Sequence, residues 1–171
     1  AHFGEFIGYK PARLYLARCD AYLRNGYAEG IEENELSQTW SEDYSSGIAD
    51  IDSHHRALLS QLNVLTVAVR EGRSSDARPI LEKIARETEA QFNAEMVQMQ
   101  DSRYFFQSDH DHQHRRFLRN LARLSDEILS ETENAIYLAF RIKLLLMDWT
   151  INHSVKTDRH LGHHLKSRSG G

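Results

Sequence analysis

Pairs of polar side chains recur in this sequence at positions where the helical pattern calls for apolar ones. The pairs are Gln91 with Glu95 in AQFNAEM, His110 with His114 in HDHQH, and His153 with Asp158 in WTINHSVKTD. A spacing of four residues places two side chains on the same face of a helix. Because an unpaired imidazole or carboxylate is costly inside a core, these groups need partners such as one another or a metal ion.

Four long periodic segments must position these side chains. They run from about Ile48 to Val69, from Ser75 through Met99, from His110 to Ile128, and from Glu133 to Leu165. Strand-like alternation is absent, and short connections between amphipathic helices indicate antiparallel neighbours. The sequence therefore predicts an all-α fold, an antiparallel up-down-up-down four-helix bundle.

An additional helix is predicted near the N-terminus, from Pro11 to Asn25, followed by a glycine-rich and acidic connector over residues 26–39. We expect three parts: an N-terminal helix and connector (1–38), the four-helix bundle (39–166), and a tail or linker (167–171). The chain begins at Ala1 without a methionine and ends in SRSGG. These ends are typical of a piece of a longer protein, so we expect a covalently linked output domain.

Composition narrows the class of protein. The 171 residues carry a net charge of −4, which argues against nucleic-acid binding. The single cysteine, Cys19, excludes an internal disulfide framework and a cysteine-based zinc site, and it favours a cytoplasmic location. No apolar run is long enough to span a bilayer, so no membrane partner is expected. The sequence gives no prediction of oligomeric state.

Each predicted helix supplies at least one metal-ligating side chain from its core face. The set consists of His55, Glu95, His110, His114, His153 and Asp158. Antiparallel helices bring core positions of matching height together, so these four imidazoles and two carboxylates are expected to meet. A mixed nitrogen and oxygen set of this kind suits two iron ions, or other first-row ions, better than magnesium or calcium.

Four stretches of the sequence resemble the hemerythrin family, particularly bacterial hemerythrin domains. They are WSEDYSSGIADIDSHHRALL, QFNAEM, YFFQSDHDHQHRRF and WTINHSVKTD. The resemblance covers about residues 39–165. It includes the Trp40 to Asp52 lead-in, the HxxxH pair with Phe117 three residues further on, and the HxxxxD pair preceded by Trp149.

The resemblance implies a role for each member of the set. His110, His114 and His153 would bind one coordinatively filled iron, and His55 would bind the second. Glu95 and Asp158 would bridge the two non-heme ions together with an oxo or hydroxo group. Dioxygen would bind at the second, open iron, and Phe92 and Trp149 would help line its pocket.

Gln91 departs from the family pattern, which usually has histidine at this position. Its amide oxygen is a weaker donor to iron than imidazole, so Gln91 is only a candidate ligand. We expect a second iron that is held less tightly, so that the chain retains two irons or only one. We also expect an additional exchangeable position and a less stable dioxygen adduct.

Other residues of the same types are predicted to lie outside the site. His54 is about 100° around the helix from His55 and should point away from the metals, and His112 lies off the face of His110 and His114. The histidines near the end of the last helix, His160, His163 and His164, are predicted to be solvated. Trp40 and Tyr44 are expected to be packing anchors.

The leading functional hypothesis is a non-enzymatic di-iron domain that binds or senses dioxygen or redox state, as a regulatory module of a larger protein. One alternative is a di-iron site with weak oxidase, peroxide or nitric oxide chemistry. The Glu-x-x-His spacing of ferritin-like di-iron enzymes is absent from the chain. The other alternative is a metal-depleted helical interaction module.

Overall fold

The computed structural model describes residues 36–131 and 133–169, and within them every regular element is helical and strands are absent. Helices α2 (Ala49–Arg70), α3 (Ser74–Asp101) and α4 (Gln107–Ser130) are followed by a fourth column of helical segments. The column consists of α5 (Ala135–Ile142), the π-helical turn η4 (Lys143–Met147), α6 (Asp148–His153), the π-helical turn η5 (Ser154–Asp158) and α7 (Arg159–Ser169). A short 3-10 turn, η3 (Glu42–Tyr44), precedes α2.

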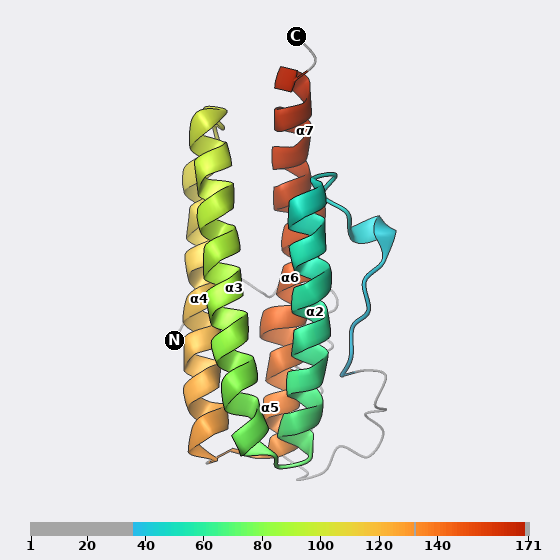
Figure 1. Ribbon diagram of the computed structural model, residues 1–171, viewed down its shortest axis with the longest axis vertical. Helices are drawn as coiled ribbons and strands as arrows, with labels where there is room; N and C mark the ends of the chain where they lie inside the picture. The colour runs from blue at the N-terminus through green and yellow to red at the C-terminus, as the bar shows by residue number, and fades with distance from the viewer. Residues whose placement is uncertain (1–35, 132, 170–171) are drawn as a thin grey trace, which may run out of the picture. The chain divides into compact units, whose positions relative to one another are not determined.

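The four columns lie side by side and alternate in direction (Figure 1). Helix α2 contacts α3, α3 contacts α4, and the fourth column contacts both α4 and α2, which closes the bundle. The predicted all-α four-helix bundle is therefore confirmed. None of the described helices combines the length and the hydrophobicity needed to cross a membrane.

The contacts of the chain group Leu36–Gly171 as one compact unit. The predicted N-terminal helix over Pro11–Asn25, and the connector up to residue 35, lie outside the described residues. The boundaries at residues 38 and 166 remain predictions.

The ends of the helices carry residues that suit the backbone conformation or the capping hydrogen bonds found there. Gly72 adopts a left-handed φ of +66° directly after α2, a conformation that favours glycine at the end of a helix. Glu131 adopts a φ of 54° at the end of α4. The Asn134 side chain then accepts hydrogen bonds from the backbone N–H groups of Ile136 (2.9 Å) and Tyr137 (3.4 Å), which caps α5.

A polar layer crosses the bundle between two apolar layers. The larger apolar layer includes Leu58 to Val69 of α2, Leu81 to Phe92 of α3, Phe117 to Ile128 of α4, and Leu138 to Met147 of the fourth column. The smaller one contains Ile51, Met99, Tyr104 and Leu161. In every column, the predicted ligands lie in the sequence between residues of the larger apolar layer and residues of the smaller one. They therefore form the polar layer. They are buried, with exposed fractions of 0–3%.

The two π-helical turns were not predicted from the sequence, which indicated one uninterrupted α-helix. Five residues of regular α-helix would turn Asp158 about 140° away from the direction of His153. The wider turn η5 lies between these two residues and returns Asp158 to the face that carries His153. The HxxxxD spacing therefore depends on a π-helical turn.

The lead-in to α2 is fastened to the bundle by polar contacts. Asp52 accepts hydrogen bonds from the hydroxyls of Ser45 (2.5 Å) and Ser46 (2.7 Å) and from the Ser46 backbone N–H (2.8 Å). Gly162 of α7 approaches so closely that a Cβ there would lie 2.4 Å from the Ser46 carbonyl oxygen. Trp40 and Tyr44 pack edge to face, with ring centroids 6.0 Å apart. Their predicted role as packing anchors agrees with this contact.

Candidate metal centre

Five of the six predicted ligands form one compact buried cluster. They are Glu95, His110, His114, His153 and Asp158, and each offers one ligand atom within 4.8 Å of all the others. They come from α3, α4, α6 and η5, so the cluster depends on the assembled bundle rather than on any one helix. We refer to these five residues as the ligand cluster.

Three imidazole nitrogens converge in the ligand cluster. The Nε2 atoms of His110, His114 and His153 lie 3.0–3.1 Å from one another. A triangle of this size fits three ligands at about 90° around an ion about 2.1 Å from each nitrogen, whereas tetrahedral ligands would be separated by about 3.4 Å. The three nitrogens therefore match one face of an octahedral site, which suits iron better than tetrahedral zinc.

The two carboxylates each divide their oxygens between two directions. Asp158 Oδ1 lies 3.1 Å from both His110 Nε2 and His153 Nε2, whereas Oδ2 lies 3.6 Å from His55 Nε2. Glu95 Oε2 lies 3.4 Å from His110 Nε2 and 3.3 Å from His114 Nε2. Its other oxygen, Oε1, accepts a hydrogen bond of 3.1 Å from Gln91 Nε2. Each carboxylate thus faces the three imidazoles with one oxygen and the side of His55 and Gln91 with the other.

Several polar atoms of this region are buried without a hydrogen bond of acceptable geometry. They are Glu95 Oε2, both carboxylate oxygens of Asp158, and the Nδ1 atoms of His55, His110 and His114. Such groups are expensive in a core unless a further partner satisfies them. These carboxylate oxygens lie near imidazole nitrogens but do not have hydrogen-bond geometry with them. Donor atoms that surround a metal ion are arranged in this way. The residues therefore fit a metal ion.

The protonation states of the metal-free cluster follow from burial and from opposite charges. Burial opposes charge on Glu95 and Asp158, but neighbouring histidines outweigh it, lowering the pKa of Glu95 to about 2 and that of Asp158 as well. Burial lowers the pKa of His55 and His114. Burial acts in the same direction on His110, but the nearby Asp158 and Glu95 outweigh it and raise the pKa of His110 to about 9. Charged carboxylates and neutral imidazoles are the forms that bind metals, so His110 would have to lose a proton to bind one.

A second layer of side chains holds the imidazoles in place. Gln113 Oε1 lies 3.0 Å from His153 Nδ1 and accepts a hydrogen bond of 3.1 Å from the Thr157 hydroxyl. With Nδ1–H donating to the amide oxygen, His153 turns the lone pair of Nε2 toward the cluster. Phe92 stacks on His114 at 3.7 Å between centroids, and Trp149 stacks on His153 at 4.3 Å. Phe92 and Trp149, the predicted pocket residues, thus pack directly on two of the candidate ligands.

The side of the cluster nearer His55 has fewer donors. It offers His55 Nε2, Asp158 Oδ2 and Glu95 Oε1, and Gln91 stands where a further donor would be expected. Amide orientation follows from the hydrogen-bond network, and here it directs Nε2, a donor that cannot bind a cation, toward Glu95. In this arrangement Gln91 orients a carboxylate and is not aimed at a metal.

Three further residues lie near the site. His54, which was predicted to point away from the metals, does not belong to the ligand cluster, and its Nε2 atom is buried without a hydrogen bond. His164 is half-buried, and its Nε2 donates to the Ser102 carbonyl oxygen at 3.0 Å. Tyr104, in the connection between α3 and α4, is only 5% exposed. The sequence signal for Tyr104 was its place among three consecutive aromatic residues before the HxxxH pair.

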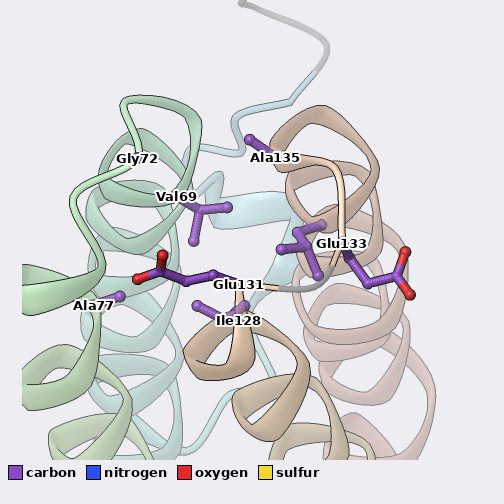
Figure 2. Close-up of a pocket in the computed structure, with 8 residues that line it drawn as sticks. Val69, Gly72, Ala77, Ile128, Glu131, Glu133 and Ala135 are labelled. Carbon is purple, nitrogen blue, oxygen red and sulfur yellow. The ribbon is translucent and has the colours of Figure 1, made fainter. Parts of the chain in front are cut away.

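A surface hollow lies elsewhere on the bundle, between the ends of α2 and α4 and the start of α5. Val69 and Ile128 point into it, whereas the Glu133 carboxylate points away (Figure 2). None of its lining residues belongs to the ligand cluster. This hollow is therefore separate from the ligand cluster.

Comparisons with known proteins agree with this architecture. No protein-family profile matches the chain. Proteins named Bacteriohemerythrin from Pseudomonas paraeruginosa (strain DSM 24068 / PA7) and Stenotrophomonas maltophilia (strain R551-3) are each 25% identical to it over 114 residues. The aligned region covers 67% of this chain and 72% of each relative. Together with the helical bundle and its buried ligand cluster, these relatives support a hemerythrin-like domain in this chain.

Proposed function

We propose that this domain binds iron in its polar layer and uses it to bind or sense dioxygen or the redox state, without catalytic turnover. The observation that carries this proposal is the division of the Asp158 and Glu95 oxygens between two sides of one buried cluster. A carboxylate that faces two groups of donors is suited to hold two ions. When bound, iron would supply a redox-active centre for dioxygen or a related small ligand.

The two sides of the cluster would hold iron unequally. His110, His114 and His153, with one oxygen each of Glu95 and Asp158, provide five donors for the first ion. The second position would have His55 and the remaining carboxylate oxygens, and Gln91 binds one of those oxygens through its amide N–H. We therefore propose a firmly held first iron and a weakly held second iron.

The regulatory role rests on how the lead-in joins the bundle. Gln38 donates its backbone N–H to Asn63 Oδ1 at 3.0 Å, and Asn63 Nδ2 donates back to the Gln38 carbonyl at 2.8 Å. Lys143 Nζ also donates to Gln38 Oε1 at 3.1 Å. We propose that residues 39–166 form a cytoplasmic sensory unit, anchored at Gln38 and joined to an output domain.

Anaerobic titration of the full chain with ferrous iron tests this proposal. Bound iron would be counted by elemental analysis, and absorption spectra would be recorded without oxygen, in air and with peroxide. We expect iron to bind and air to produce the charge-transfer bands of a bridged di-iron centre, at least in part of the protein. His110→Ala should abolish binding, whereas His112→Ala, an exposed neighbour on α4, should not. A stable protein that binds no iron would refute the proposal, and sustained multiple turnover would show an enzyme instead.

A further inference from the structure

A tyrosine and a histidine form a hydrogen-bonded pair beside the ligand cluster. The Tyr104 hydroxyl lies 2.7 Å from Nδ1 of His160. Tyr104 belongs to the connection between α3 and α4, and His160 belongs to α7, so the pair joins segments that are distant in the sequence. Neither residue is among the predicted metal ligands.

The two members of the pair differ in their access to solvent. Tyr104 is buried, with 5% of its surface exposed, and its ring packs edge to face on His110, with centroids 6.3 Å apart. His160 is exposed. The pair therefore leads from a residue of the ligand cluster to the surface within two side chains.

Aromatic contacts hold this pair in place. Phe106 packs edge to face on both members, at 6.1 Å from Tyr104 and 5.2 Å from His160. The ring of His164 lies 5.2 Å from that of Tyr104, and its Nε2 is fixed by the Ser102 carbonyl. A buried tyrosine usually finds a hydrogen-bond partner. Here the partner is an imidazole, which can accept a proton at one nitrogen and release one at the other.

We propose that Tyr104, with His160 as the acceptor of its phenolic proton, carries electrons between the protein surface and the metal centre. The inference rests on the proposed iron binding. As Tyr104 gives one electron to an oxidised centre, its phenolic O–H bond would break and the proton would move to His160 Nδ1. A one-electron donor at the surface, such as a reduced flavin or ascorbate, then returns the electron, and the proton returns to the phenolate oxygen. The net result is one electron transferred from donor to centre.

Reduction of the iron-loaded, air-oxidised full chain by ascorbate tests this route. Loss of the charge-transfer absorption would be followed in H2O and in D2O. We expect Tyr104→Phe, which keeps the ring on His110, to slow reduction by about 100-fold, the lower range for loss of a positioned proton-transfer group. His160→Gln should slow it similarly. The unaltered protein should react more slowly in D2O, and Tyr104→Phe should lose this isotope effect.

Matched controls separate this role from a structural one. His163→Gln changes an exposed histidine of the same helix, and Tyr137→Phe changes a tyrosine of α5; both should reduce at the unaltered rate. Iron content is measured in every variant, so that rates are compared at equal loading. If Tyr104→Phe is fully loaded and is reduced at the unaltered rate with the same isotope effect, the inference is wrong.

A measurement on the metal-free protein distinguishes failure of this inference from failure of iron binding. Flash photo-oxidation with a ruthenium tris-bipyridine sensitiser generates tyrosyl radicals, which electron paramagnetic resonance detects. We expect Tyr104→Phe to remove one radical component and His160→Gln to reduce its yield. Equal radical spectra in the unaltered protein and in both variants would overturn the inference, whether or not iron binds.

Discussion

Replacing Gln91 with histidine should strengthen binding at the second metal position. In the structure the Gln91 amide donates to Glu95 Oε1 at 3.1 Å, so it occupies an oxygen that faces this position. An imidazole would add a nitrogen donor on the same helix face and release that oxygen. The substitution tests whether the amide is what weakens the second metal position.

The expected magnitude follows from the groups involved. Loss of a hydrogen bond to a charged acceptor costs about 1.5–3 kcal/mol in the metal-free protein. Partners that only orient a metal ligand contribute about 10–100-fold to metal affinity, and a direct ligand should contribute at least as much. We therefore expect the dissociation constant of the second iron to fall by at least about 10–100-fold, or about 1.4–2.8 kcal/mol.

Anaerobic iron titration with elemental analysis measures this change, and the lifetime of the dioxygen adduct provides a second reading. Gln91→Leu removes the amide without adding a ligand and should leave the second iron weak. Asn93→His places a histidine at an exposed position of α3, about 200° around the helix from Gln91, and should not increase iron content. If Gln91→His leaves both the stoichiometry and the adduct lifetime unchanged, the assignment of this position is wrong.

Three further predictions concern the stability of the metal-free protein in urea unfolding. Gly162→Ala should lower the free energy of unfolding by about 1–3 kcal/mol, because its Cβ would meet the Ser46 carbonyl at 2.4 Å, whereas His163→Ala should have little effect. Phe92→Ala should lower it by about 3–5 kcal/mol through loss of a buried ring, with Val97→Ala, at an exposed site, as the control. Burial would raise the pKa of Asp52, but hydrogen bonds from Ser45 and Ser46 outweigh it and lower that pKa. Its stabilisation is therefore present above the unfolded pKa of about 3.9 and is lost as the pH falls through the lower folded value. Asp52→Asn should thus destabilise by about 1–2 kcal/mol near neutral pH, and an equal effect at pH 2 and pH 7 would contradict this.

The fold could be predicted because its signals are local and periodic. Apolar residues at helical spacing, and stops such as Gly72, are legible within one helix, and His110 with His114 follow from a spacing of four. The contribution of Asp158 was less direct, since a spacing of five fits one face only with the π-helical turn η5. Periodicity alone does not reveal such a turn. The sequence indicated Asp158 as a carboxylate close to His153 in the chain, and the resemblance implied its bridging role.

Contacts between distant segments were the features that the sequence did not reveal. The approach of Gly162 to Ser46, and the hydrogen bond between Tyr104 and His160, depend on how α7 lies against the lead-in and the α3–α4 connection. A glycine or a tyrosine in a helical sequence has many ordinary explanations. Only the assembled bundle shows that one removes a steric clash and that the other reaches from a candidate ligand to the surface.

His54 does not supply the imidazole that the family pattern has at position 91, although the Nε2 atom of His54 is buried without a hydrogen bond. The rings of the three clustered histidines have centroids 4.5–4.8 Å apart, whereas those of His54 and His55 are 5.9 Å apart. Neighbouring residues of one helix diverge by about 100°, so both imidazoles cannot face one ion without distortion of α2. The proposed second position would therefore have a single imidazole, and its affinity would depend on the two carboxylate oxygens and on the orientation that the Gln91 amide gives to one of them.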